Sequence, residues 1–265
     1  MEMDENGNIT KLLGIGSKEV IFFGSTGYNN GVYLLNDICK SRYGNASLGA
    51  TARSLNIEDI ESRMNSKGIA ARNACKVGTT QYGTTRKYTT RGFKNYPAIY
   101  AQEKYSGINV SDVADGTQVI TGSVDATAQA KMNPSGKTVS EDVYTAVTTD
   151  TSKTASTTLT CTQTCYKVSQ SSSYYDDTNF YSMIFGTVTQ FWLASRYVDC
   201  NSGTSYAYFG LRYVYYNDLS GSYLFDSCNG SSDNRCRLAP VVSLGSGIQV
   251  KSGSGTTEDP YIIGK

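Results

Sequence analysis

Tyrosine is concentrated in one stretch near the C-terminal end of the chain, where it is interleaved with small polar residues and cysteine. A tyrosine side chain offers a large, rigid contact area at low entropic cost, while Ser, Gly and Asn adapt their hydrogen bonds to different partners. Exposed aromatic patches usually mark interaction sites. We therefore expect a ligand-binding surface in this stretch. Its candidate contact residues are Tyr197, Cys200, Asn201, Tyr206, Tyr208, Tyr213, Tyr215, Tyr216, Asn217, Asp218, Tyr223, Asp226, Cys228, Asn229, Asp233, Asn234, Arg235 and Cys236.

Strand alternation is expected to separate core from surface within this stretch. Successive side chains of a strand point to opposite faces. Ala207, Phe209 and Leu211 would therefore enter the core, and Tyr206 and Tyr208 would lie on the other face. Tyrosine carries much of the energy of many interfaces, so we expect five contact anchors: Tyr206, Tyr208, Tyr213, Tyr215 and Tyr216. The alternative is that the rings only pair with one another across an antiparallel sheet.

Few residue types in the chain suit catalysis or metal binding. There is no histidine, which removes the imidazole base, the Ser-His and Cys-His nucleophile pairs and the His metal ligand. The seven cysteines have spacings that match no zinc or redox motif. The oxygen-rich segment Asp176–Asn179 lacks the spacing of a calcium loop and is predicted to be a solvated turn. We expect no enzyme activity, no cofactor and no metal.

The composition narrows the class of partner. Hydrophobic residues make up 39% of the chain, which indicates a folded, polar-rich protein. The net charge of +1, without a long basic run, argues against nucleic acid, and no apolar stretch is long enough for a membrane helix. The start has no signal-peptide pattern. We expect a protein or cell-surface ligand and an extracellular, cell-surface or virion-surface location, with any leader or anchor belonging to the parent protein.

The elements that position this surface begin near the N-terminus. Glu19–Phe23 is a short apolar run that predicts a strand, and Gly24–Gly27 has the character of a turn. A helix is predicted around Leu34–Arg42, ending at Gly44 or Asn45.

A second helix has a clear start signal. Asn56 is expected to cap it, with Asp59 three residues on. Ile57, Ile60 and Met64 would form its buried stripe, and Gly68 would end it.

Residues 75–175 change in character and are rich in Thr, Ser and Gly with short Val or Tyr alternations. Examples are Val143–Val147 and Thr157–Cys165. These patterns predict an inserted, mostly β segment whose strand order is open. The stretch that follows contains the large apolar groups, and its predicted buried framework residues are Trp192, Phe209, Leu211, Leu238 and Val241.

Mutagenesis of adenines would explain the mixture of residues in the tyrosine-rich stretch. Asn, Asp, Tyr, Ser, Gly, Cys, Arg and Phe all arise when the adenines of an Asn codon are replaced. The surrounding runs Phe191–Arg196, Ala207–Arg212 and Arg237–Leu244 resemble the variable proteins of diversity-generating retroelements, in particular those of gut Firmicutes and phages. Asn30–Asp37 and Ala52–Glu61 resemble the same group.

The resemblance implies a fold and a role. It implies an α+β, C-type-lectin-like domain (the fold also of formylglycine-generating enzymes) over residues 1–265, with the β-rich insertion at 75–175 and a variable ligand-binding region at 191–244. In that family, reverse transcription of a template repeat diversifies one solvent-facing surface so that it recognises changing targets. The calcium-dependent sugar-binding signatures of animal lectins are absent from this chain.

Two alternatives remain open. In the first alternative, the chain is a fixed structural subunit of a pilus, phage fibre or adhesin. In the second it is a formylglycine-generating-type oxidase, whose chemistry needs a reactive cysteine pair such as Cys228 and Cys236.

Overall fold

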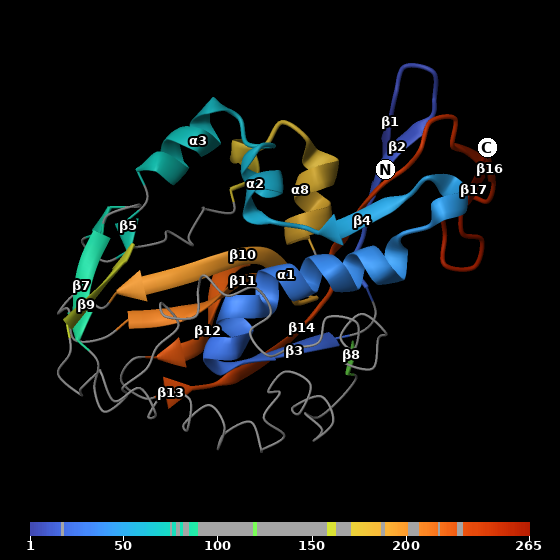
Figure 1. Ribbon diagram of the computed structural model, residues 1–265. Coiled ribbons are helices and arrows are strands. Elements are labelled where there is room, and N and C mark those ends of the chain that lie inside the picture. The colour runs from blue at the N-terminus through green and yellow to red at the C-terminus, as the bar shows by residue number, and fades with distance from the viewer. Residues whose placement is uncertain are drawn as a thin grey trace.

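The computed structural model describes residues 1–16, 19–74, 76–77, 80–81, 85–89, 119–120, 158–162, 171–186, 189–200, 207–216, 218–226 and 230–265. These residues form a mixed structure of helices and sheets in which strands predominate (Figure 1). The coarse α+β class predicted from the sequence is therefore compatible with the structure.

The larger sheet contains seven of the described strands in the order β13-β12-β11-β10-β14-β3-β8. Its neighbours are antiparallel, except that β10 and β14 pair in parallel at a single position. The strand predicted at Glu19–Phe23 is confirmed as β3, and it pairs antiparallel with β14 from the C-terminal part of the chain. The strands are β3 (Glu19–Phe23), β8 (Val119–Ile120), β10 (Phe191–Cys200), β11 (Ala207–Tyr215), β12 (Asp218–Asp226), β13 (Gly230–Ser231) and β14 (Asp233–Arg237).

A smaller sheet joins the two ends of the chain in the order β1-β2-β15-β4. Its strands are β1 (Glu2–Met3), β2 (Ile9–Leu13), β4 (Thr51–Ser54) and β15 (Pro240–Ser243). Beyond it, β16 (Gln249–Ser252) and β17 (Ile262–Gly264) pair with each other, and both termini lie at this end of the molecule (Figure 1).

Helix α1 (Gly24–Tyr43) lies across the larger sheet and is longer than predicted. Leu34, Leu35 and Ile38 are buried as expected. The turn predicted at Gly24–Gly27 is wrong, because these residues form the first turn of α1. Gly31 explains how the helix can lie so close to the sheet: a Cβ at this position would overlap the side chain of Leu211.

Asn56 caps α2 (Ile57–Glu61) in a full capping box with Asp59, as predicted: Asp59 N donates to Asn56 Oδ1 at 2.8 Å, and Asn56 N donates to Asp59 Oδ2 at 3.0 Å. The predicted end at Gly68 is wrong. The chain turns after Glu61, and Asn65 caps a separate helix, α3 (Ser66–Asn73), which contains Gly68. The helix α8 (Thr178–Phe185) and the 3-10 turns at Ala46–Leu48 and Ser172–Tyr174 complete the helical elements of the described residues.

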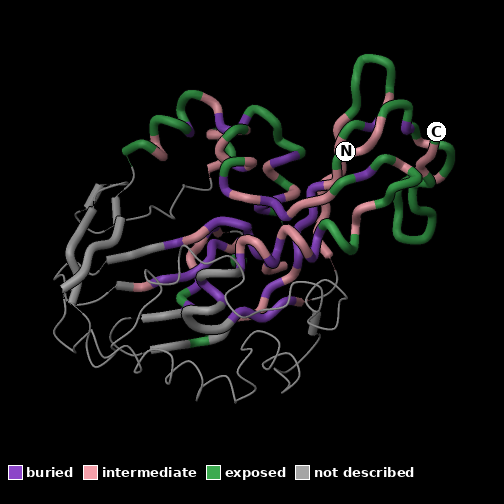
Figure 2. The backbone as a smooth tube through the Cα atoms, in the orientation of Figure 1, coloured by how far each residue is buried: buried purple, intermediate pink, exposed green. Residues whose placement is uncertain are grey.

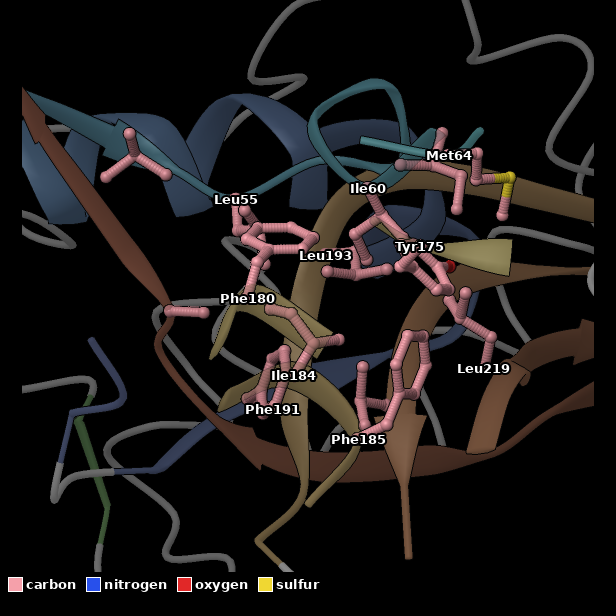
Figure 3. Packing of buried hydrophobic residues seen from close by; sticks show 14 residues of the cluster. Leu55, Ile60, Met64, Tyr175, Phe180, Ile184, Phe185, Phe191, Leu193 and Leu219 are labelled. Atoms are coloured by element: carbon pink, nitrogen blue, oxygen red, sulfur yellow. The ribbon is translucent and has the colours of Figure 1, made fainter. Parts of the chain in front are cut away.

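Buried stretches of the backbone gather in the larger sheet and in α1 (Figure 2). Two hydrophobic clusters pack there, and neighbouring residues of β10 belong to different clusters. Trp192 belongs to the first cluster, with β3, α1 and Leu211, and its indole N–H donates to Val20 O at 2.8 Å. Phe191 and Leu193 belong to the second cluster, with residues of α2 and α8 (Figure 3). Burial of each such side chain contributes roughly 1.5–3 kcal/mol. All five predicted framework residues are buried: Trp192, Phe209, Leu211, Leu238 and Val241.

The middle of the chain falls largely outside the described residues, including the predicted strand Val143–Val147. Within the described parts, β5 (Lys76–Val77) pairs with β6 (Thr80–Gln81), and β7 (Thr85–Thr89) pairs with β9 (Thr158–Thr162). The strand β9 lies within the predicted stretch Thr157–Cys165.

Candidate ligand-binding surface

Three neighbouring antiparallel strands, β10, β11 and β12, carry eight of the eighteen candidate contact residues, and β14 carries four more. A tight hairpin joins β11 to β12, with Tyr215 opposite Asp218. Phe209 and Leu211 are buried, as predicted, but the alternation does not hold along the whole of β11, because Arg212 and Val214 are buried as well and Tyr215 is exposed. Tyr208, in contrast, is only partly buried.

Among the candidate tyrosines whose side chains the structure describes, three are exposed. Tyr215, Tyr216 and Tyr223 expose 42%, 58% and 41% of their surface. Tyr215 and Tyr223 lie in strands next to the buried residues Val214 and Leu224, and Tyr216 lies in the turn that follows β11.

The rings form two groups. In the first, the ring of Tyr223 stacks on that of Tyr208, with centroids 4.2 Å apart, and lies 5.7 Å from Tyr197. Tyr197 is buried, and Gly221 makes room for it, because a Cβ there would overlap the Tyr197 ring.

The second group extends from the core to the tip of the hairpin. Tyr213 packs partly against the first hydrophobic cluster, with its ring 6.0 Å from that of Trp192. Tyr215 lies 5.6 Å from Tyr213, and Tyr216 meets Tyr215 edge-on at 4.5 Å. Tyr216 has a φ of 42°, in the left-handed region that tyrosine rarely adopts.

A shallow pocket of about 400 Å³ lies between the two groups and β14. Asn234 Nδ2 donates to Ser222 Oγ at 2.8 Å across it. Burial raises the pKa of Tyr213 to about 12, so its hydroxyl remains protonated at neutral pH. The pocket thus combines aromatic walls with neutral hydroxyl and amide groups. Its lining residues are Tyr213, Ser220, Gly221, Ser222, Tyr223, Ser232 and Asn234.

The serines of this pocket are not among the predicted contact residues. Serine is common along the whole chain, so the amino-acid composition does not distinguish the serines of the pocket from the others. The strand register would have revealed Ser220, which lies opposite Tyr213.

Two predicted contact residues do not face solvent. Tyr197 and Cys236 are buried, so the prediction that they lie on the exposed surface is wrong. Cys236 packs into the first hydrophobic cluster, and burial, reinforced by the charge of Glu19, raises the pKa of its thiol. A thiol with so little thiolate is a poor nucleophile.

The other candidates are placed less fully. Asp218 is partly buried at the start of β12, and Asn234 and Arg235 are partly buried within β14. Only the strand position is described for Cys200, Asp226 and Asp233, which lie in β10, β12 and β14. Five candidates lie outside the described residues: Asn201, Tyr206, Asn217, Cys228 and Asn229.

The described residues contain no group of three or more His, Cys, Asp or Glu side chains arranged to hold a metal ion. In the oxygen-rich segment Asp176–Asn179, Asp177 caps the N-terminus of α8, where its Oδ1 accepts a hydrogen bond from Phe180 N at 2.9 Å. No helix in the described part of the chain is long and apolar enough to span a membrane.

Comparison of the chain with protein-family models, with curated protein sequences and with solved structures found no match.

Proposed function

We propose that the chain is a ligand-binding protein of the receptor or adhesin type, whose exposed residues on β11, on β12 and in the hairpin between them are diversified by a retroelement. The proposal includes a C-type-lectin-like domain over residues 1–265, with its variable region at 191–244. Its ligand is a protein or another cell-surface molecule, encountered outside the cell or on a virion.

The observation that carries the proposal is the conformation of Tyr216. This residue sits at the hairpin tip with a φ of 42°. Among residues other than glycine, Asn tolerates such a backbone well, and hairpin tips favour it. A Tyr codon arises from an Asn codon by a single adenine replacement. A strained, exposed tyrosine at an asparagine-favouring position is what adenine mutagenesis of a fixed hairpin would produce.

The arrangement of the other tyrosines supports the same function. Tyr223 is exposed at the edge of a pocket and Tyr215 is exposed at the end of β11, while Phe209 and Leu211 of the same hairpin are buried. Changes at the exposed positions therefore leave the packing beneath them intact, as a diversified surface requires.

A fixed structural subunit is the second candidate. The stacking of Tyr208 on Tyr223 favours it, because ring pairs across strands stabilise a sheet without any ligand. The exposure of Tyr216 at the hairpin tip has no such explanation.

The proposal can be tested with a display library. Adenine-type replacements at the codons of Tyr215, Tyr216 and Tyr223 should yield folded variants that bind protein targets chosen at random. The matched control is a library at Gln249, Lys251 and Ser252, which are exposed but distant in the fold from the tyrosine groups. The proposal is wrong if the tyrosine library yields no more binders than the control library, or if most of its members are unfolded.

A further inference from the structure

A second pocket lies where the hairpin of β1 and β2 meets α2 and α8, and none of its lining residues belongs to the tyrosine-rich stretch 197–236. It has a volume of about 250 Å³. Its apolar floor consists of Leu13, Leu55, Phe180, Met183 and Val241.

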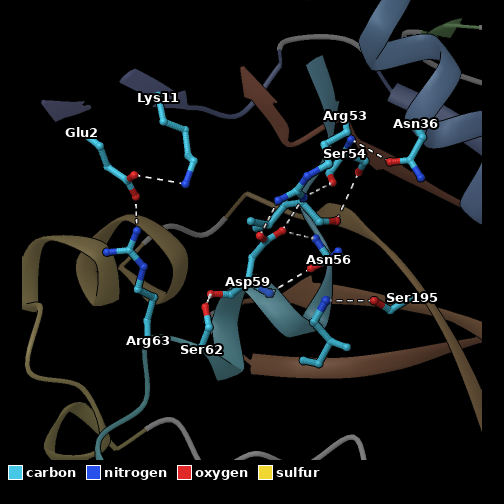
Figure 4. Close-up of polar contacts among 12 residues, drawn as sticks. Glu2, Lys11, Asn36, Arg53, Ser54, Asn56, Asp59, Ser62, Arg63 and Ser195 are labelled. Atoms are coloured by element: carbon cyan, nitrogen blue, oxygen red, sulfur yellow. Dashed lines mark hydrogen bonds and ion pairs between the residues drawn. The ribbon is translucent and has the colours of Figure 1, made fainter. Parts of the chain in front are cut away.

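Two cations converge on one carboxylate at the rim of this pocket (Figure 4). Lys11 Nζ lies 3.1 Å from Glu2 Oε2, and the Arg63 guanidinium contacts the other oxygen of Glu2. Arg63 is held from behind by the ring of Phe180, whose centroid lies 5.5 Å from the guanidinium carbon. Burial opposes ionisation of Glu2, but Lys11 and Arg63 outweigh it and lower its pKa. The carboxylate is therefore charged at neutral pH.

The resident carboxylate is weakly held. Glu2 belongs to a two-residue strand at the edge of the smaller sheet, and the pairing of β1 with β2 is irregular there. The side chains of Glu2, Lys11 and Arg63 are 39%, 39% and 35% exposed. Ion pairs as exposed as these contribute little net stability.

We propose that this pocket binds a small amphipathic monocarboxylate, which displaces Glu2 from Lys11 and Arg63 and lays its apolar body on the floor. Glu2 is then an internal competitor for the site. The inference does not depend on the tyrosine-rich surface or on its diversification.

The geometry selects a carboxylate. Each oxygen of Glu2 meets a different cation, an arrangement that suits a planar group with two acceptor oxygens. A dianion such as a phosphate monoester is disfavoured, because Asp59 and Asp177 also line the pocket. Asp177 Oδ2 lies 3.8 Å from Arg63 Nη1.

The size of the pocket limits the apolar body. Ligand pockets usually enclose about 300–1,000 Å³, so a volume of about 250 Å³ suits a short chain. Hexanoate is a suitable probe, with hexan-1-ol and hexyl phosphate as comparisons.

Binding of hexanoate to the full chain can be followed by NMR titration. Removing an internal competitor raises the fraction of binding-competent protein, so Glu2→Gln should bind hexanoate about fivefold more tightly than the unmodified chain. Glu5→Gln is the matched control, since it makes the same charge change on an exposed residue that does not line the pocket. Adding Arg63→Met to Glu2→Gln should weaken binding at least about tenfold, because it keeps an apolar side chain against Phe180 but removes the charge.

Each of the following results would overturn the inference. In the first, Glu2→Gln would bind hexanoate no more tightly than Glu5→Gln does. In the second, hexan-1-ol would bind as tightly as hexanoate, and in the third, hexyl phosphate would bind more tightly than both. Thermal unfolding of each variant checks that it is folded, and Arg63→Lys, which keeps the charge, should restore part of the binding in the Glu2→Gln background. Failure of Arg63→Lys to bind better than Arg63→Met would count equally against the cation's role.

Discussion

Replacement of Trp192 is the strongest test of whether buried framework residues stabilise the fold more than the exposed tyrosines do. Trp192 is fully buried, lies in the middle of the first hydrophobic cluster, and donates its indole N–H to Val20 O. Trp192→Ala should cost about 3–5 kcal/mol from lost burial and the cavity. The Val20 carbonyl also loses its donor, which places the cost at the upper end of that range.

Tyr215→Ala is the comparison on the surface. The Tyr215 ring is 42% exposed and lies against two other tyrosine rings, those of Tyr213 and Tyr216. Its loss should cost less than about 1 kcal/mol. Tyr213→Ala should fall between the two, at about 1–2 kcal/mol, because its ring is partly packed against Trp192.

Thermal unfolding followed by far-ultraviolet circular dichroism measures these differences. For a chain of this size each kcal/mol lowers the melting temperature by about 2–4 °C, so Trp192→Ala should melt about 10–20 °C below the unmodified chain. Trp192→Phe, which keeps an aromatic ring but loses the donor, should lose about 1–3 kcal/mol. Equal losses for Trp192→Ala and Tyr215→Ala would refute the division.

Three further predictions concern the hairpin tip, the capping box and the close contact of α1 with the sheet. Tyr216→Asn should stabilise the chain by about 0.5–1 kcal/mol in denaturant unfolding by relieving the left-handed strain, and a loss of stability would contradict that reading. Burial alone would raise the pKa of Asp59, but its hydrogen bonds with Arg53 and the Asn56 backbone and the charge of Arg53 lower this pKa below 3.8. The stabilisation of the folded chain by the Asp59 carboxylate is therefore complete above pH 3.8, and it disappears as the pH falls through the lower pKa of the folded chain. The stability difference between the unmodified chain and Asp59→Asn should therefore shrink below about pH 4, and a constant difference would exclude the linkage. Gly31→Ala should cost about 1–3 kcal/mol by thermal unfolding because the added methyl overlaps Leu211, and an unchanged melting temperature would show that α1 can move away.

The sequence predicts those features of the fold that depend on neighbouring residues. The capping box at Asn56 is such a feature, because its two hydrogen bonds join residues three apart in the chain. The start of α1 could not be predicted in this way. Gly24–Gly27 is helical because the helix packs closely on a sheet whose strands come from the other end of the chain.

The sequence identifies some exposed residues of the candidate surface and misplaces others. Composition alone finds Tyr215, Tyr216 and Tyr223, which are exposed. It misplaces Tyr197, because the register of β10 against β11 shifts between Trp192 and Arg196, so side-chain alternation cannot be carried across that point. It misplaces Cys236 because β14 lies inside the larger sheet, a position that only the strand order reveals.

Deep sequencing of this gene and its flanks in the source population tests the central claim most directly. The account predicts adenine-directed changes within the codons for residues 197–236, most frequent at exposed positions such as Tyr215, Tyr216 and Tyr223, and absent at Trp192. It also predicts a nearby near-copy repeat and a reverse transcriptase gene. An invariant stretch without these neighbours would contradict the account and would leave a fixed, tyrosine-rich structural subunit as the better description.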